Sequence, residues 1–180
     1  FAFLDIGANQ GLFSLVAARN PNCRKIVAME PVPCTFAKLD ANFALNELGE
    51  RAEAINAALA DQAGSAEIAL KPEHSGAASL REGTDFGGPC QTIRLFSIAE
   101  LDPHIPANLP LFVKIDIEGY EPIAIRQLLK SVHANRIMAM FYEMDERWVD
   151  AASVRCDLEA AGFPRFRKFG IGRHYDMLAE

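Results

Sequence analysis

The stretch FLDIGANQGLFSL, residues 3–15, indicates how this chain folds. An apolar run ends at Asp5, and Gly7 and Gly11 follow with three residues between them, ahead of an apolar pattern typical of a helix. In an open α/β sheet, ligands bind at the carboxyl ends of the strands. Glycine has no Cβ, so a ligand can approach the backbone of such a turn closely. The stretch therefore predicts a buried strand, a ligand-binding turn and a helix, although a tight turn without a ligand would give the same pattern.

Segments typical of strands and helices alternate along the rest of the 180 residues. Apolar runs predict strands at 1–6, 25–29, within 52–59, and at 66–70, 91–96, 111–117 and 136–142, with two short strands in 166–178. Helical patterns occur at 11–19, 33–48, 122–131 and 148–161. Continuous apolar strands that alternate with helices are typical of a parallel sheet covered on both faces. We expect a single, doubly wound α/β domain over residues 1–180.

The net charge and the length of the apolar runs limit the classes of partner that the chain is expected to bind. The chain carries 18 basic and 24 acidic residues, a net charge of −6, whereas surfaces that bind nucleic acid are usually basic. No apolar run approaches the roughly 18 residues that a membrane span needs, so we expect no membrane partner and a cytoplasmic location. The chain begins without Met and inside an apolar run, which leaves open an N-terminal trim and the loss of a targeting segment.

The turn at residues 7–11 differs from the dinucleotide fingerprint. That fingerprint is G-x-G-x-x-G, and its second glycine admits the pyrophosphate. Here Ala8 and Asn9 follow Gly7, so the pattern favours a nucleoside ligand without a pyrophosphate. Glu30 supports this interpretation, because an acid about 20 residues beyond such a turn can bind ribose hydroxyls. A solvated loop acid is the simpler alternative for Glu30.

Acidic residues gather after two later strands. In LFVKIDIEGYEP, residues 111–122, Lys114 lies inside an apolar strand, where a charge is costly unless it is paired. A structural ion pair with a nearby carboxylate is one explanation. The nearby acids could instead bind a cation, accept a proton or hold a hydroxylated molecule. They are Asp116, Glu118, Glu121, Glu143 and Asp145.

Five segments of the chain together carry a family resemblance. The segments that carry it, in order, are LDIGANQGLFSL (4–15), MEPVPCTFAKLDANFALN (29–46), INAALAD (55–61), HSGAASL (74–80) and VKIDIEGYE (113–121). As an ordered set they resemble the FkbM-type methyltransferases, which are S-adenosylmethionine-dependent enzymes. Glu143 matches an acid often found after the next strand in that family.

The resemblance implies a seven-stranded, Rossmann-like methyltransferase sheet whose final strand is antiparallel. It implies O-methylation of a hydroxyl on a sugar, a glycan or a polyketide-like small molecule. Ribose would contact Glu30, and Asn56 would lie near the adenine. The residues implied to line the methionine part of S-adenosylmethionine are Asp5, Gly7, Asn9 and Gly11.

A base near the acceptor hydroxyl would assist such a transfer. The candidates are Asp116, Glu143 and His74, and a divalent metal held by Asp116 and Glu143 could instead lower the pKa of the hydroxyl. His74 stands where the resemblance implies a polar amide, which leaves the acceptor open. The other histidines, His104, His133 and His174, have no convincing spacing and are interpreted as structural or exposed.

Two other functions remain open from the sequence. One is a nicotinamide-dependent oxidoreductase on the same topology, against which the absent pyrophosphate turn argues. The other is a non-catalytic module that binds a nucleoside or a partner protein. The ribose acid and the acidic residues together argue against that module. The oligomeric state is open.

Overall fold

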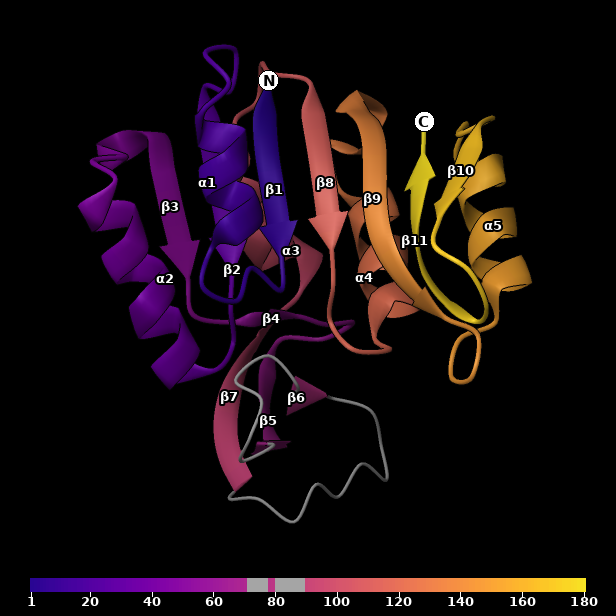
Figure 1. Cartoon of the computed structure of the whole chain (residues 1–180), viewed down its shortest axis with the longest axis horizontal. Coiled ribbons are helices and arrows are strands. Elements are labelled where there is room, and N and C mark those ends of the chain that lie inside the picture. Colours follow the sequence, from indigo (N-terminus) through magenta and orange to yellow (C-terminus); the bar gives the residue numbers. More distant parts are fainter. Residues whose placement is uncertain (71–77, 80–89) are drawn as a thin grey trace.

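A computed structural model of the chain describes residues 1–70, 78–79 and 90–180. The main sheet has seven strands in the order β10-β11-β9-β8-β1-β2-β3 (Figure 1). Their bounds are β1 Ala2–Ile6, β2 Lys25–Met29, β3 Ala52–Ile55, β8 Leu111–Ile115, β9 Ile137–Asp145, β10 Phe166–Phe169 and β11 His174–Ala179. Strands β3, β2, β1, β8 and β9 pair in parallel, and β11 is antiparallel to both of its neighbours. The doubly wound, mostly parallel seven-stranded fold predicted from the sequence is confirmed.

Helices cover both faces of this sheet (Figure 1). Helices α1 (Leu12–Ala18) and α2 (Pro33–Leu45) lie on one face, where Leu39 and Phe43 pack against Ile26 and Ala28 of β2. Helices α3 (Ile98–Leu101), α4 (Glu121–Lys130) and α5 (Ala151–Ala160) lie on the other, over the larger part of the core. Side chains alternate between faces along a strand, so these two apolar layers use alternate residues of the same strands.

A second, smaller sheet lies beyond the carboxyl edge of the first (Figure 1). Its strand order is β4-β7-β5-β6, with bounds β4 Ala58–Leu59, β5 Gly64–Leu70, β6 Ala78–Ser79 and β7 Cys90–Phe96. The antiparallel pair β5 and β7 is the strand pair expected around residues 66–96. The small sheet therefore stands below the ends of β1, β2 and β8, where a ligand of the main sheet would bind.

The structure differs from the sequence prediction at several boundaries. The strand expected to reach residue 117 ends at Ile115, and the strand expected to end at residue 142 continues to Asp145. Helix α2 ends at Leu45 rather than near residue 48, because Glu47 has a φ of 53° that no α-helix accommodates. Helix α3 was not predicted, although Ser97 and Glu100 form the capping box that marks its start.

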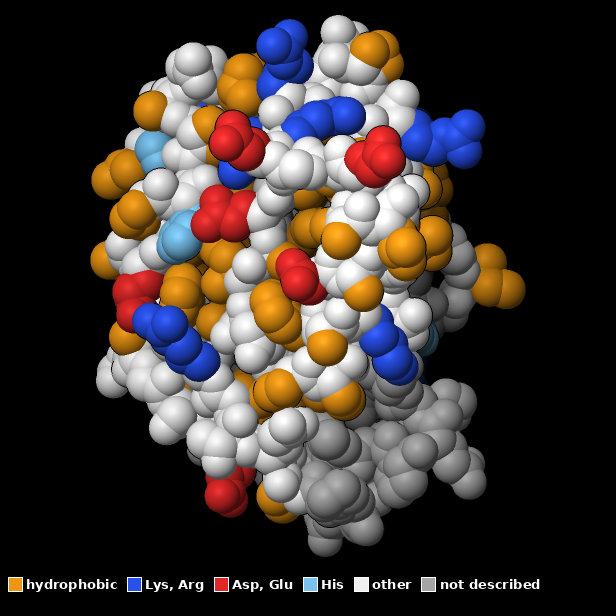
Figure 2. Space-filling model, turned by 90° about the vertical axis from the view of Figure 1, so that its left-hand side faces the viewer, with side chains coloured by type: hydrophobic (Ala, Val, Ile, Leu, Met, Phe, Trp, Pro, Cys, Tyr) orange, Lys and Arg blue, Asp and Glu red, His pale blue; other side chains and the backbone are white. Residues whose placement is uncertain are grey.

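None of the helices within the described ranges is both long enough and apolar enough to cross a membrane. Figure 2 shows the side of the molecule that carries β3 and α2. Acidic and basic side chains are interspersed there among apolar ones.

Candidate functional site

The turn between β1 and α1 is built from left-handed backbone conformations. Gly7, Asn9 and Gly11 have φ values of 76°, 51° and 87°. A Cβ on Gly7 would lie 2.0 Å from the carbonyl oxygen of Asp116, the residue after β8. Only glycine fits at residue 7, because both the conformation and the space exclude a side chain. The turn after β1 thus touches the backbone after β8, and two parts of the predicted site meet at the carboxyl edge.

Glu30 fixes the same turn from the end of β2. One carboxylate oxygen accepts a hydrogen bond from the Asn9 N–H at 3.0 Å, and the other accepts one from the Val32 N–H at 2.9 Å. The residue is 6% exposed, so it is not the solvated loop acid considered from the sequence. Burial is the main cause of a raised Glu30 pKa, and these two hydrogen bonds oppose that rise. A carboxylate has about four acceptor positions, so two remain for a ligand.

Two asparagines, Asn56 and Asn9, lie next to Glu30 at the carboxyl edge of the sheet. The Asn56 side chain donates to the carbonyl oxygens of Glu30 and Pro31 at 2.8 and 3.0 Å, which holds the chain that leaves β2. The side-chain oxygen of Asn9 is buried and has no hydrogen-bond partner among the described residues. A buried polar atom without a partner is costly, so this oxygen is available for a donor on a ligand.

Lys114 lies beneath the turn rather than in the site. Its ammonium is 3.2 Å from the carboxylate of Asp5 and donates to the Gly7 carbonyl at 2.6 Å. The other oxygen of the fully buried Asp5 accepts a hydrogen bond from the Ser14 hydroxyl at 2.7 Å. The structural ion pair considered for Lys114 is therefore present. Asp5 supports the turn through Lys114 and Ser14.

The five acids after β8 and in β9 do not form one cluster, because each has a different environment. Asp116 is half-exposed and 3.6 Å from the Lys114 ammonium. Glu118 has a φ of 54°, which breaks the strand alternation expected from the sequence. The buried Glu121 accepts hydrogen bonds from the N–H groups of Ile117 and Gly119, and burial raises its pKa to about 7. Asp145 is paired with Arg147, whose hydrogen bond lowers the Asp145 pKa to about 2.

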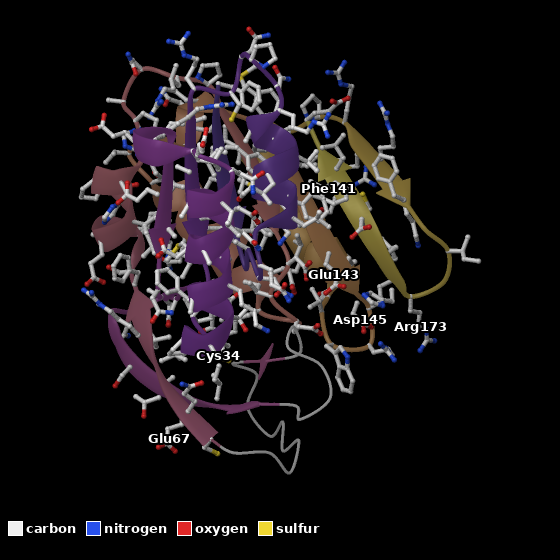
Figure 3. All side chains as sticks on the ribbon, turned by 60° about the vertical axis from the view of Figure 1, so that its left-hand side comes forward. Cys34, Glu67, Phe141, Glu143, Asp145 and Arg173 are labelled. Atoms are coloured by element: carbon white, nitrogen blue, oxygen red, sulfur yellow. The ribbon has the colours of Figure 1, made fainter. Side chains whose placement is uncertain are left out.

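Glu143 is hydrogen-bonded to a histidine that the sequence did not single out. The Nε2 of His174 is 2.6 Å from Oε1 of Glu143. In the β9–β11 pairing Asp176 is opposite Glu143, and His174 is opposite Asp145, so the four side chains share one face. Phe141, Glu143 and Asp145 follow one another along β9 in Figure 3. The interpretation of His174 as merely structural or exposed missed this pair, because two positions 31 residues apart show no sequence spacing.

The predicted residues thus gather from different elements at one edge. Gly7, Asn9, Gly11, Glu30 and Asn56 surround the turns after β1, β2 and β3, whereas Asp116 and Glu143 lie toward β8 and β9. His74 falls outside the described residues. Within the described parts of the chain, no group of three or more His, Cys, Asp or Glu side chains could hold a metal ion. The metal pair suggested for Asp116 and Glu143 stays a prediction, and here those carboxylates contact Lys114 and His174 instead.

Comparison with solved structures places the fold among methyltransferases. The methyltransferase FkbM from Methylobacillus flagellatus KT aligns with 99% of this chain at a TM-score of 0.63 and 14% identity. The N-terminal domain of human METTL16, solved in complex with SAH, aligns with 99% at a TM-score of 0.56 and 13% identity. Identities this low show the fold alone.

Sequence comparison identifies the family. The chain is 36% identical over 77 residues to the methyltransferase sdnD of Sordaria araneosa, a match that covers 43% of this chain and 30% of that protein. The chain covers 44% of the FkbM protein from Methylobacillus flagellatus. It therefore spans less than half the length of each of these two proteins. The family model for the methyltransferase FkbM domain matches residues 5–165. The ordered motifs, the seven-stranded sheet and this match agree: the chain belongs to the FkbM methyltransferase family.

Proposed function

We propose that this domain binds S-adenosylmethionine and transfers its methyl group to a hydroxyl of a sugar, a glycan or a polyketide-like small molecule. The observation that carries the proposal is the hydrogen bond between Asn9 and Glu30, which holds a buried carboxylate against the glycine turn at the carboxyl edge, where the sequence has no pyrophosphate turn. Family membership supports the methyl transfer, and the SAH bound by the METTL16 relative is the product form of this cofactor.

The residues present fit this cofactor. The unpartnered Asn9 oxygen suits an ammonium donor, such as the amino group of the methionine part. The two remaining acceptor positions of Glu30 suit the ribose hydroxyls. Gly7 and Gly11 hold the left-handed turn beside which the cofactor would bind, and Asn56 would lie beside the adenine. When bound, the cofactor supplies a methyl group already activated by a positively charged sulfur.

The protein's task is then mainly to position the acceptor and to accept its proton. Holding two reactants in line lowers the barrier by removing the entropy cost of their encounter. Asp116 is half-exposed at the end of β8, next to the Gly7 turn, and could accept a hydrogen bond from a polyhydroxylated acceptor. Glu143 lies on the neighbouring strand β9, two residues beyond Phe141, which is opposite Lys114. Asp116 and Glu143 form the acceptor side of the proposed site, and His74 remains a candidate beside them.

Calorimetric titration with S-adenosylhomocysteine, S-adenosylmethionine and NAD tests the cofactor assignment. We expect S-adenosylhomocysteine to bind and to raise the melting temperature, since ligand at about 100 times its Kd adds about 2.7 kcal/mol of stability. Binding of NAD without S-adenosylhomocysteine would favour the oxidoreductase. Binding of S-adenosylhomocysteine without turnover on any of a panel of sugars, glycosides and polyketide-like hydroxyl compounds would favour the non-catalytic module.

Asp116→Asn separates a role at the acceptor from a structural one. If Asp116 orients the acceptor, the variant should keep cofactor affinity and lose roughly 10²-fold or more in turnover on a panel compound. The exposed Asp157→Asn, which removes a surface ion pair with Arg126, is a matched control that should change neither quantity. Normal turnover, with a melting temperature lowered only by the small amount expected for a screened ion pair, would assign Asp116 to the support of Lys114 alone. Chelation followed by addition of a divalent ion tests the metal-assisted alternative in the unmodified protein.

A further inference from the structure

The pair formed by His174 and Glu143 is built as a proton acceptor. The Nε2 of the imidazole is 2.6 Å from Oε1 of Glu143, which is 21% exposed. Glu143 accepts hydrogen bonds when ionised, so the neutral imidazole carries its proton on Nε2 and donates it to the carboxylate. The Nδ1 atom is then an acceptor, and among the described residues it has no hydrogen-bond partner. The His174 side chain is 56% exposed, so a molecule at the edge can reach it.

The location of the pair matches the acceptor side of the proposed site. Glu143 follows Phe141 on the same face of β9, and Phe141 is opposite Lys114 of β8 in the sheet register. The Phe141 ring is 6.2 Å from the ring of Phe13, which comes from the helix directly after the Gly7 turn. His174 is therefore on the same face and at the same edge as the cofactor turn.

We infer that His174 is the catalytic base of the methyl transfer and that Glu143 is its positioning residue. The inference rests on the proposed function. As the acceptor oxygen forms its new bond to the methyl carbon, the bond between carbon and sulfur breaks and its electron pair stays on sulfur. The hydroxyl proton passes to Nδ1 of His174. Glu143 holds the ring in the productive tautomer and stabilises the imidazolium that forms.

The sequence left the choice of base among Asp116, Glu143 and His74, and His174 is a better base than either of the two carboxylates. A base works best when its pKa lies near the working pH, and an imidazole with an ordinary pKa of about 6.5 meets that condition better than a carboxylate near 4. Glu143 is moreover occupied by its hydrogen bond to His174, and Asp116 by its ion pair with Lys114. Of the side chains of Asp116, Glu143 and His174, the imidazole is the one with an unbonded atom, Nδ1, that is a strong proton acceptor.

The charges around His174 set the pH range in which it can act. Its hydrogen bond to Glu143 is the main cause of a raised His174 pKa, with Asp145 adding to the rise and Arg147 opposing it. Asp176, the neighbour on β11, also faces the imidazole, and its own pKa is raised by burial. Because the base must be deprotonated, turnover should rise with pH through the raised His174 pKa and level off above it.

The test is a nitrogen NMR titration of the histidines in the whole chain, with the His174 signal assigned from His174→Gln. We expect the Nε2–H tautomer in the neutral form, and a lower His174 pKa in Glu143→Gln than in the unmodified protein. The matched control is His104, whose Nδ1 is 2.6 Å from Glu53. Glu53 also pairs with Lys25, the first residue of β2, so this second pair belongs to the opposite end of the sheet.

Cofactor charge provides the decisive comparison. S-adenosylmethionine carries a positive sulfur and S-adenosylhomocysteine does not. A positive charge near an imidazole disfavours its protonated form. We expect S-adenosylmethionine to lower the protonated fraction of His174 relative to S-adenosylhomocysteine, and to leave His104 unchanged. In the turnover assay, His174→Gln should lose roughly 10²-fold and His104→Gln should lose nothing.

The possible failures are distinguishable. If neither ligand binds, the proposed function is wrong and this inference falls with it. If both bind but affect His174 and His104 alike, or if His174→Gln turns over normally, the site is a methyltransferase site with another base. An Nδ1–H tautomer, or a His174 pKa that Glu143→Gln leaves unchanged, would overturn the role of Glu143.

Discussion

Replacement of Lys114 by Met should destabilise the protein strongly, because it leaves a buried carboxylate without its counter-charge. The Lys114 side chain is 4% exposed, and that of Asp5 is fully buried 3.2 Å away. At an effective dielectric constant of 20, Coulomb's law gives about 5 kcal/mol for this separation. Broken buried pairs cost about 3–5 kcal/mol. The second pair, to the half-exposed Asp116 at 3.6 Å, is screened and adds at most about 1 kcal/mol.

The assay is reversible denaturant unfolding with a parallel thermal melt. A loss of about 3–5 kcal/mol corresponds to roughly 6–20 °C in melting temperature for a chain of 180 residues. Lys130→Met, at the exposed end of α4, is the control and should change stability by less than about 0.5 kcal/mol. The double variant Lys114→Met with Asp5→Asn should recover part of the loss, because the buried charge is removed with its partner.

Two results would refute this reasoning. A single Lys114→Met variant that loses less than about 1 kcal/mol would show that water reaches Asp5. A double variant that loses the sum of the two single losses would show that the two residues act independently. Because Lys114 also donates to the Gly7 carbonyl, we further expect weaker binding of S-adenosylhomocysteine in the single variant, measured below its melting temperature.

Three further predictions concern the same edge. Glu30→Ala should reduce S-adenosylhomocysteine affinity at least tenfold in a titration, since hydrogen bonds to a charged group contribute about 1.5–3 kcal/mol each, and unchanged affinity would remove Glu30 from the cofactor site. The folded-state pKa of Glu121 is raised to about 7 from an ordinary 4.5, so its contribution lowers stability as pH rises through that range, by about 3 kcal/mol in total. Glu121→Gln should flatten the stability profile between pH 4.5 and 7, and an equally steep profile would assign that slope to other groups. Gly7→Ala should melt far lower than Gly11→Ala, because the added Cβ meets the backbone oxygen of Asp116 in the first variant and a flexible leucine side chain in the second, and equal melting temperatures would contradict that difference.

The fold could be predicted because its signals are local. The strand before Asp5, the glycine turn and the apolar strand at Lys25–Met29 are each contained in a few consecutive residues. Strand ends were harder, because continuation depends on the neighbour. Strand β9 continues to Asp145 since β11 pairs with it as far as His174, and that pairing is invisible in either segment alone.

Candidate site residues could be named from the sequence, and their roles stay predictions. Residue types at strand ends and the family motifs pointed to the same positions, although Asp5 among them is buried beneath the turn. Which partner each side chain takes is a matter of three-dimensional contacts between distant segments. The pairing of Lys114 with Asp5 spans more than 100 residues, and Glu121 turns inward to accept hydrogen bonds from the loop before α4. The pair of Glu143 and His174 has the same origin.

The close approach of Gly7 to the backbone after β8 has a consequence for how two ligands would bind. The turn that would hold the cofactor and the strand end that would face the acceptor touch directly, and Lys114 ties both to Asp5. A ligand that displaced Asp116 would therefore be expected to move the turn that would hold the other ligand as well. Such coupling is reciprocal by thermodynamic necessity. The factor by which bound cofactor would raise the affinity for the acceptor must equal the factor by which bound acceptor would raise the affinity for the cofactor, whichever of the two binds first.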